Sequence, residues 1–173
     1  MSDKANDRAN DRANDRVFVD TNILLYARDS NQPLKQPLAI AWMSRCWRER
    51  CGRLSFQVLQ EYYVNATRKL QPGLPKELAR QDVRNLLAWQ PVQTDALLLE
   101  SAWGLSDRYG FSWWDAQIVA AARRADCAIL LSEDMQHGLE IERLRIVNPF
   151  LNPEAGAFSE WSGAADDEAY RGL

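Results

Sequence analysis

The chain has 173 residues, of which 46% are hydrophobic and 26% charged, and its formal net charge is −3. This length fits a single domain with a substantial core. The longest uninterrupted apolar run, residues 38–43, is far shorter than the roughly 18 residues of a membrane-spanning helix. The first residues also lack the apolar segment of a secretory signal. The composition therefore argues against a membrane or exported protein, and we expect a cytoplasmic one.

Both ends differ in composition from the middle of the chain. Residues 1–16 repeat Ala-Asn-Asp-Arg three times, with charges that cancel, so we expect a low-complexity, disordered leader. Residues 151–173 carry five acidic residues and one basic residue, which indicates a flexible acidic tail with Trp161 as a candidate anchor. Residues 17–150 remain as the folded domain, with 16 basic and 15 acidic residues. Its net charge of +1 leaves a polyanionic partner open.

Hydrophobic spacing predicts strands that alternate with helices through residues 17–150. The expected strands are 17–20, 53–56, 91–93, 127–131 and 145–147. The expected helices are 22–28, 38–50, 58–66, 76–89, 95–109 and 113–125, the last capped by Ser112. Such alternation is typical of a parallel sheet covered on both faces. We therefore predict an α/β fold, a three-layer α/β/α sandwich around a central parallel sheet.

The cysteines and the single histidine indicate neither a disulfide framework nor a zinc site. Cys46, Cys51 and Cys127 are odd in number and form no CxxC pair, so we expect reduced thiols in the core. The spacing of these cysteines from His137 is too wide for a zinc motif.

Four acidic residues fall where a parallel sheet brings distant segments together. Asp20 ends the first expected strand, Glu61 lies in the helix after the second, Asp115 in the first turn of its helix, and Asp134 just after the fourth strand. Ligands of such folds bind outside the carboxyl ends of the strands. Two carboxylates about 4 Å apart repel by roughly 4 kcal/mol at an effective dielectric near 20, which favours a bound cation. Oxygen ligands suit Mg²⁺ or Mn²⁺, so the sequence predicts a centre for one of these ions.

Three of these acids also have a purely structural explanation. Asp20 or Asn22 suits a helix cap, Asp134 suits an Asx turn, and Glu61 suits the solvated face of a helix. The residues alone leave these alternatives open.

Asp115 is harder to explain structurally. Its helical spacing places it on the apolar stripe of Ile118, Val119 and Ala122. A carboxylate there costs several kcal/mol unless a cation or hydrogen-bond donors satisfy it. We therefore expect Asp115 to be a buried carboxylate that meets a cation from solution.

Four segments of the chain resemble the PIN-domain ribonucleases, and most closely the VapC-type toxins of bacterial toxin–antitoxin pairs. They read VFVDTNILLY, LSFQVLQE, SWWDAQI and LLSEDMQHG and occupy residues 17–26, 54–61, 112–118 and 130–138. The resemblance extends over about residues 17–150. It implies a parallel sheet flanked by helices and Mg²⁺- or Mn²⁺-dependent cleavage of RNA, leaving a 5′-phosphate and a 3′-hydroxyl.

The same resemblance implies roles for individual residues and partners. The catalytic and metal-binding acids would be Asp20, Glu61, Asp115 and Asp134, with Asn22 helping to hold the first carboxylate and Ser132 supporting the site. The implied function is that of a type II toxin that inhibits translation or growth. The implied assembly is a homodimer, silenced by an antitoxin whose C-terminal segment fills a groove.

Basic and aromatic residues provide candidate RNA contacts. Arg68 and Lys69, near the end of the Glu61 helix, are candidates for phosphate binding. Trp113 is a candidate for base stacking, and we expect one of Trp113 and its neighbour Trp114 in the core and the other exposed. His137 is given a structural or RNA-contacting role, because metal-activated water needs no histidine base.

Two other functions compete with a nuclease. The first is a PIN-fold module that binds RNA or protein with weak or no cleavage. The second is a phosphotransferase of the haloacid dehalogenase type, which needs a second aspartate two positions after the first. Asn22 occupies that position, which argues against the second alternative.

Overall fold

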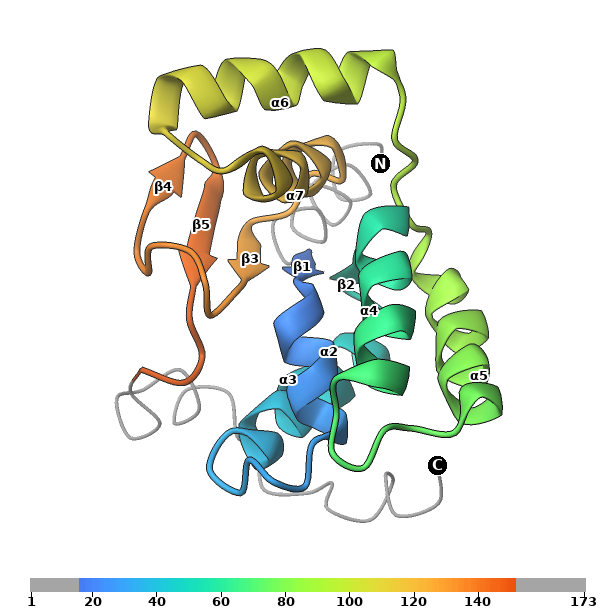
Figure 1. The fold of residues 1–173 in the computed structure, drawn as a ribbon. Coiled ribbons are helices and arrows are strands. Elements are labelled where there is room, and N and C mark those ends of the chain that lie inside the picture. The colour runs from blue at the N-terminus through green and yellow to red at the C-terminus, as the bar shows by residue number, and fades with distance from the viewer. Residues whose placement is uncertain (1–15, 152–173) are drawn as a thin grey trace, which may run out of the picture.

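Five strands form one sheet in the order β2–β1–β3–β5–β4 (Figure 1). The structure is a computed structural model and describes residues 16–151. The strands are β1 (Val17–Val19), β2 (Gly52–Arg53), β3 (Ile129–Leu131), β4 (Glu140–Ile141) and β5 (Leu144–Val147). β1 pairs in parallel with β2 and β3, and β3 pairs in parallel with β5. Only β4 is antiparallel, at the edge beside β5.

Six α-helices and one 3₁₀ helix accompany this sheet within residues 16–151. They are α2 (Thr21–Arg28), α3 (Gln36–Arg48), α4 (Phe56–Arg68), α5 (Lys76–Leu86), η1 (Leu87–Trp89), α6 (Ala96–Tyr109) and α7 (Trp113–Arg124). In Figure 1, α6 and α7 lie together above the strands, while α2, α3, α4 and α5 gather below them and to the right. The expected α/β fold, with a mostly parallel sheet flanked by helices, is confirmed.

The side chains that cap the helices fix where several of them begin. Asp20 accepts from the Thr21 N–H at the start of α2, and Asp95 accepts from the Leu98 N–H at the start of α6. Ser112 accepts from the Asp115 N–H, which confirms the cap predicted for α7. These caps hold Asp20 and Asp115 at the first turns of their helices.

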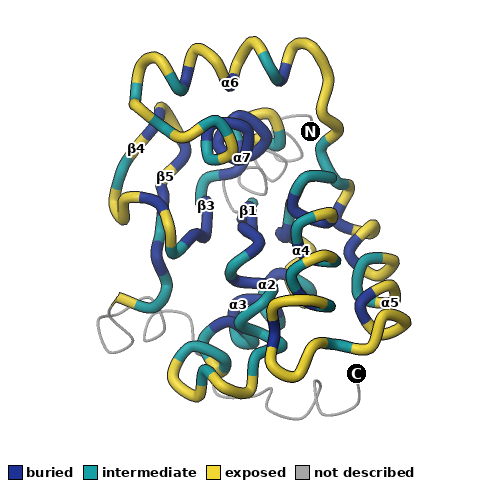
Figure 2. The backbone as a smooth tube through the Cα atoms, viewed as in Figure 1, coloured by how far each residue is buried: buried dark blue, intermediate teal, exposed yellow. Residues whose placement is uncertain are grey.

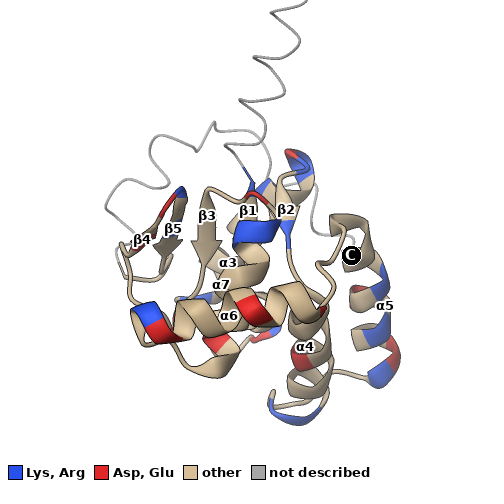
Figure 3. Cartoon of the chain, turned by 90° about the horizontal axis from the view of Figure 1, so that it is seen from above, with Lys and Arg blue, Asp and Glu red and all other residues tan. Residues whose placement is uncertain are grey.

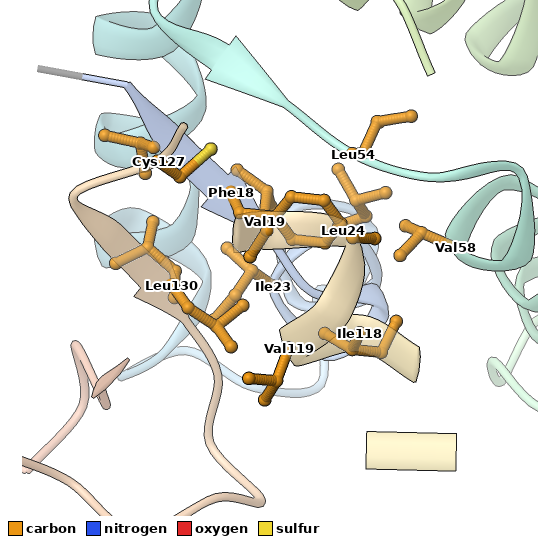
Figure 4. Close-up of a cluster of buried hydrophobic side chains, with 14 of the residues drawn as sticks. Phe18, Val19, Ile23, Leu24, Leu54, Val58, Ile118, Val119, Cys127 and Leu130 are labelled. Carbon is orange, nitrogen blue, oxygen red and sulfur yellow. The ribbon is translucent and has the colours of Figure 1, made fainter. Parts of the chain in front are cut away.

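The core lies between the strands and the inner faces of the helices. Phe18 and Val19 of β1 and Leu130 of β3 have no exposed surface. Figure 4 shows Ile118 and Val119 of α7 in the same cluster of apolar side chains. Figure 2 shows buried strands and a largely buried α7, in contrast to the exposed outer side of α6. The core therefore holds β1 and β3, the strands that lead to Asp20 and Asp134, in one rigid unit.

Some predicted elements differ from the structure. The strand expected at 91–93 is a single bridge between Val92 and Ser55, and β2 ends at Arg53. The helix expected at 76–89 changes to a 3₁₀ turn after Leu86 and ends at Gln90, whose φ is 55°. β4 was not predicted, because two residues are too short to show a periodicity.

The proposed leader and tail lie outside the described residues, apart from their innermost residues Arg16 and Leu151. Arg16 belongs with the folded part, because its guanidinium donates to the carbonyl of Ala125 at 3.1 Å. Its own carbonyl accepts from the N–H of Ala128 at 2.9 Å.

Cys46, Cys51 and Cys127 are buried and free, as the sequence predicts. Burial raises the pKa of the Cys127 thiol to about 12. Within residues 16–151, none of the helices combines the length and hydrophobicity needed to cross a membrane.

Candidate active site

Asp20 is a buried carboxylate at the carboxyl end of the central strand β1. Its side chain accepts hydrogen bonds from the Thr21 N–H and from the Ser132 hydroxyl, both at 2.7 Å. The residue is only 7% exposed, and burial raises the pKa of its carboxyl to about 6, helped by the charges of Glu61 and Asp134. The hydrogen bonds from Ser132 and Thr21 act in the opposite direction. The ionised form of the Asp20 carboxyl is therefore destabilised by its surroundings near neutral pH.

Asn22 joins Asp20 to Asp134. Its side-chain amide N–H group donates to Asp20 at 3.4 Å and to Asp134 at 3.1 Å. Its amide oxygen accepts from the N–H of Glu133 at 3.3 Å. Because both ends of the amide are engaged, Asn22 fixes the loop after β3 against the start of α2.

Glu61 approaches the same place from the middle of α4. Its carboxylate accepts from the hydroxyl of Thr21 at 3.0 Å and from the amide of Gln57, one turn earlier, at 2.9 Å. Neither Thr21 nor Gln57 was among the predicted site residues. Two signals pointed to them: Thr21 directly follows Asp20, and Gln57 lies four positions before Glu61 on one helix face.

Asp115 is only half-buried, so the expectation of a carboxylate within the apolar stripe of α7 is wrong. The fully buried residues of α7 begin one position later, at Ala116. In the first turn of a helix, side chains tilt toward its N-terminus, and the hydroxyl of Ser112 donates to Asp115 there at 2.7 Å. Asp20, rather than Asp115, is the buried acid of this region.

Among the contacts of residues 16–151, Asp115 shares no hydrogen bond with the other three acids or with their side-chain donors, and its own partner is Ser112. The amide of Gln57, which holds Glu61, also donates to the carbonyl of Trp114 at 3.4 Å. The structure therefore links Asp20, Glu61 and Asp134 through Thr21 and Asn22, while Gln57 joins Glu61 only to the backbone of Trp114, the residue before Asp115.

The side-chain donors to these acids are all neutral within residues 16–151. None of the four acids forms an ion pair with a lysine or arginine of that range, and the donors are hydroxyl and amide groups. In the same part of the chain, no three His, Cys, Asp or Glu side chains are close enough together to form a ready metal cage. Thr21 bridges Asp20 and Glu61, and Asn22 bridges Asp20 and Asp134.

A second group of contacts, which sequence reasoning missed, anchors the loop that carries Asp134. Glu133 accepts hydrogen bonds from the Tyr26 hydroxyl and from the Lys35 ammonium, which is also its ion-pair partner. Lys35 donates to the Tyr26 hydroxyl at 3.1 Å and lies 4.5 Å from the centre of its ring. We call Tyr26, Lys35 and Glu133 the loop clamp. The clamp therefore orients Glu133, whose backbone N–H donates to the side-chain oxygen of Asn22.

Three of the residues predicted to contact RNA, namely Arg68, Lys69 and His137, lie on the surface of residues 16–151, without hydrogen bonds or ion pairs to the four acids. Arg68 and Lys69 are exposed at the end of α4. His137 is exposed, and its Nδ1 accepts from the N–H of Asn148 at 3.1 Å, which is a structural role. None of these three residues has a hydrogen bond or an ion pair with the four acids among the contacts of residues 16–151.

The two tryptophans before Asp115 differ in exposure, as expected. Trp113 is half-buried and stacks on Trp103, with ring centroids 5.9 Å apart. Trp114 is 62% exposed, so it is the solvent-facing aromatic beside the acids, although Trp113 was the predicted stacking residue.

The sheet is mostly parallel, and Asp20 and Asp134 follow its strands β1 and β3. The PIN-domain family model matches residues 17–138, so the chain belongs to the PIN-domain family. Among solved structures, the chain is similar to Mycobacterium tuberculosis VapC20, described as a Sarcin-Ricin loop cleaving toxin. The TM-score is 0.53 and the identity 22%, over 68% of this chain and 91% of that chain, so the likeness concerns the fold. A search of curated proteins found no match.

Proposed function

We propose that this PIN domain is a metal-dependent endoribonuclease that uses Mg²⁺ or Mn²⁺. The observation that carries the proposal is Asp20. Its carboxylate is buried at the end of β1, its pKa is raised to about 6, and Glu61 and Asp134 contribute to that shift. Keeping Asp20 ionised in a buried position, against the charges of Glu61 and Asp134 and with no basic partner among residues 16–151, is costly, and this cost suits a site that binds a hard cation.

The donor set fits Mg²⁺ or Mn²⁺. Asp20, Glu61 and Asp134 would hold the ion, with Asp115 as a fourth carboxylate, and all of these groups offer oxygen ligands. When bound, such an ion neutralises charge on a phosphodiester and lowers the pKa of water. The chain's own residues set the geometry: Ser132 orients Asp20, and Asn22 sets the spacing between Asp20 and Asp134.

The protonation of Asp20 sets the working pH of the proposed site. With a pKa of about 6, the carboxyl is largely ionised near pH 7 and largely neutral near pH 5. A neutral carboxyl is a poor ligand for a hard cation. Uptake of the ion by the metal-free site is therefore expected to weaken below about pH 6.

We also propose that the protein is a toxin of a type II toxin–antitoxin pair, which cuts RNA in the cytoplasm, forms a homodimer and is silenced by a cognate antitoxin. The support is the likeness in fold to VapC20, whose description names it a toxin that cleaves the Sarcin-Ricin loop. The net charge of +1 on residues 17–150 is compatible with an RNA substrate.

A second candidate function is a PIN module that binds RNA without cutting it. The observation that favours it is the absence, within residues 16–151, of three potential ligands close enough to form a ready metal cage. The two functions differ in one measurable respect, which is metal-dependent hydrolysis.

The test is cleavage of a panel of RNAs by the purified full chain, with Mg²⁺ or Mn²⁺ and with EDTA. Asp20→Asn and Asp115→Asn are compared with Asp107→Asn, a matched change at an exposed position of α6. We expect cleavage only with metal, loss of at least about a hundredfold in both site variants, and no change in the control. RNA binding without cleavage would favour the second function, and cleavage that survives EDTA and both substitutions would contradict the proposal.

A further inference from the structure

A cavity of 960 Å³ lies between α2, α3, α4 and α5, the four helices grouped below the strands in Figure 1. None of the four site acids lines it. Its apolar lining includes Leu24, Ile40, Met43, Trp47 and Leu86. A space of this size and character accommodates large apolar side chains.

The charged residues that line the cavity give it a positive character. Three are arginines, and one, Asp82, is acidic. Asp82 is already neutralised, because it accepts hydrogen bonds from Arg28, at 3.0 Å from Nε, and from the Tyr62 hydroxyl. The other two arginines, Arg48 and Arg84, are exposed at the rim. Arg48 pairs with the exposed Glu49 at 3.3 Å. Arg84 pairs with Glu77 at 2.8 Å, an exposed contact of little strength. Figure 3 shows several basic residues on α5, with acidic residues among them.

One segment of this chain has the complementary chemistry. Residues 158–168 contain Phe158 and Trp161, spaced three apart, followed by the acidic run Asp166, Asp167 and Glu168. The aromatic side chains match the apolar lining, and the acidic run matches the arginine rim. None of the four proposed site acids lies in this segment.

The described part of the chain ends beside the cavity. The ring of Phe150 packs edge-on against Tyr26 of α2 at 5.1 Å, and Ala27 and Arg28, the next two residues, line the cavity. An extended chain from Leu151 to Phe158 spans up to about 23 Å. A helix with its side chains is about 10–12 Å across. The segment is therefore long enough to pass around α2 and reach the cavity.

We propose that residues 158–168 bind in cis in the cavity between α2 and α5, with Phe158 and Trp161 inside and the acidic run on Arg48 and Arg84. This inference does not depend on nuclease activity.

Because residues 158–168 are tethered to the domain, they compete with any separate peptide for the cavity. A short flexible linker gives an effective concentration in the millimolar range. A separate peptide of residues 156–170 at micromolar concentration therefore binds poorly to the wild-type chain. It binds to a chain whose own segment has lost Phe158 and Trp161.

The first experiment is hydrogen–deuterium exchange of the full chain, read by mass spectrometry. We expect peptides covering 156–168 to exchange at least about tenfold more slowly than in the double variant F158A/W161A. The matched control is Leu97→Ala, an exposed apolar residue of α6 that is 75% exposed. Equal exchange in the wild type and in F158A/W161A would overturn the proposal.

The second experiment tests the proposed contact between the acidic run and the two rim arginines, Arg48 and Arg84. We expect R48E/R84E to release the segment, and the added swap D166K/D167K to restore its protection. The control reversal R108E/R143E, at exposed positions away from the cavity, leaves protection unchanged. If D166K/D167K fails to restore protection in R48E/R84E, the assigned contact is wrong.

The fluorescent 156–170 peptide completes the test, with anisotropy as the readout. Binding to F158A/W161A but not to the wild type supports docking in cis. Protection that disappears on dilution of the wild type would instead identify the segment of a second copy as the occupant, and would overturn docking in cis. RNA cleavage measured in parallel separates this inference from the proposed nuclease function, because F158A/W161A leaves the four acids intact.

Discussion

The hydroxyl of Ser132 donates a 2.7 Å hydrogen bond to the carboxylate of Asp20, a residue 112 positions earlier in the chain. The contact follows from the parallel pairing of β1 and β3, whose register sets Val19 opposite Leu131. The next residues of both strands, Asp20 and Ser132, therefore meet at the sheet edge. The backbone repeats the link, because the Asp20 N–H donates to the Leu131 carbonyl at 3.0 Å.

Asp20→Asn is expected to stabilise the metal-free protein near neutral pH. The folded protein holds the proton of Asp20 up to a pH of about 6, but the unfolded chain releases it near its ordinary pKa of 3.8. Stability therefore falls as the pH rises from about 4 to about 6, by about 3 kcal/mol from this residue. Urea unfolding in EDTA should show Asp20→Asn more stable than the wild type near pH 7, and the gain should disappear near pH 4. A matched Asp107→Asn variant, exposed on α6, should show no such trend.

Ser132→Ala is expected to raise the pKa of Asp20 further above about 6, since the lost hydrogen bond favours the ionised carboxyl. The pH range over which stability falls then extends to higher pH. Stability near pH 7 drops by about 1–3 kcal/mol. Ser106→Ala is the control, because its hydroxyl donates to the Phe111 carbonyl at 2.8 Å, away from any carboxylate. It should lose stability without a change in pH dependence. If the pH–stability curves of both variants ran parallel to that of the wild type, the role given to Ser132 would be contradicted.

Lys35→Met is expected to loosen the loop clamp and, through Glu133 and Asn22, the position of Asp134. We expect the rise in melting temperature on adding Mn²⁺ to shrink, because the ion stabilises only what it binds in the folded state. Lys35→Arg keeps the charge and should retain most of the shift. A full Mn²⁺ response in Lys35→Met would show that the clamp does not position the site.

Gly52→Ala is expected to destabilise the fold by about 1–3 kcal/mol, because the new methyl group would lie 2.7 Å from the ring of Trp89. Gly104→Ala is the matched change in α6, where a methyl group meets nothing within 4 Å. It should be stabilising by up to about 1 kcal/mol, as alanine favours a helix. Thermal unfolding of the two variants checks the pair, and a neutral Gly52→Ala would refute the close packing of β2 on η1.

Much of the fold was predictable because its strands and helices carry strong local patterns. The apolar run at 127–131 and the cap at Ser112 identify β3 and the start of α7 from the sequence alone. Two short elements were not predictable. β4 spans two residues, and Val92 makes only one bridge, so neither shows a period that a sequence pattern resolves.

The sequence correctly placed Asp20 and Asp134 after strands and Glu61 and Asp115 in helices, but it did not indicate the hydrogen bonds around them. The hydrogen bonds of Thr21 and Gln57 involve neutral side chains, and the loop clamp joins residues that are far apart in the chain. Contacts of these kinds leave no pattern in a single sequence. The burial of Asp115 was overestimated because helical spacing ignores the end of the helix, where Ser112 and solvent replace the core.

The parallel order of the sheet also bears on synthesis of the protein. Asp20 emerges early from a ribosome, but its partner strand β3 and the residues Ser132 and Asp134 emerge more than a hundred positions later. A nascent chain that stops before β3 therefore has Asp20, Glu61 and Asp115, but it lacks Asp134 and the Ser132 hydroxyl that donates to Asp20. Under the proposed function, the cell that makes this nuclease is exposed to its activity only after nearly the whole domain has been translated.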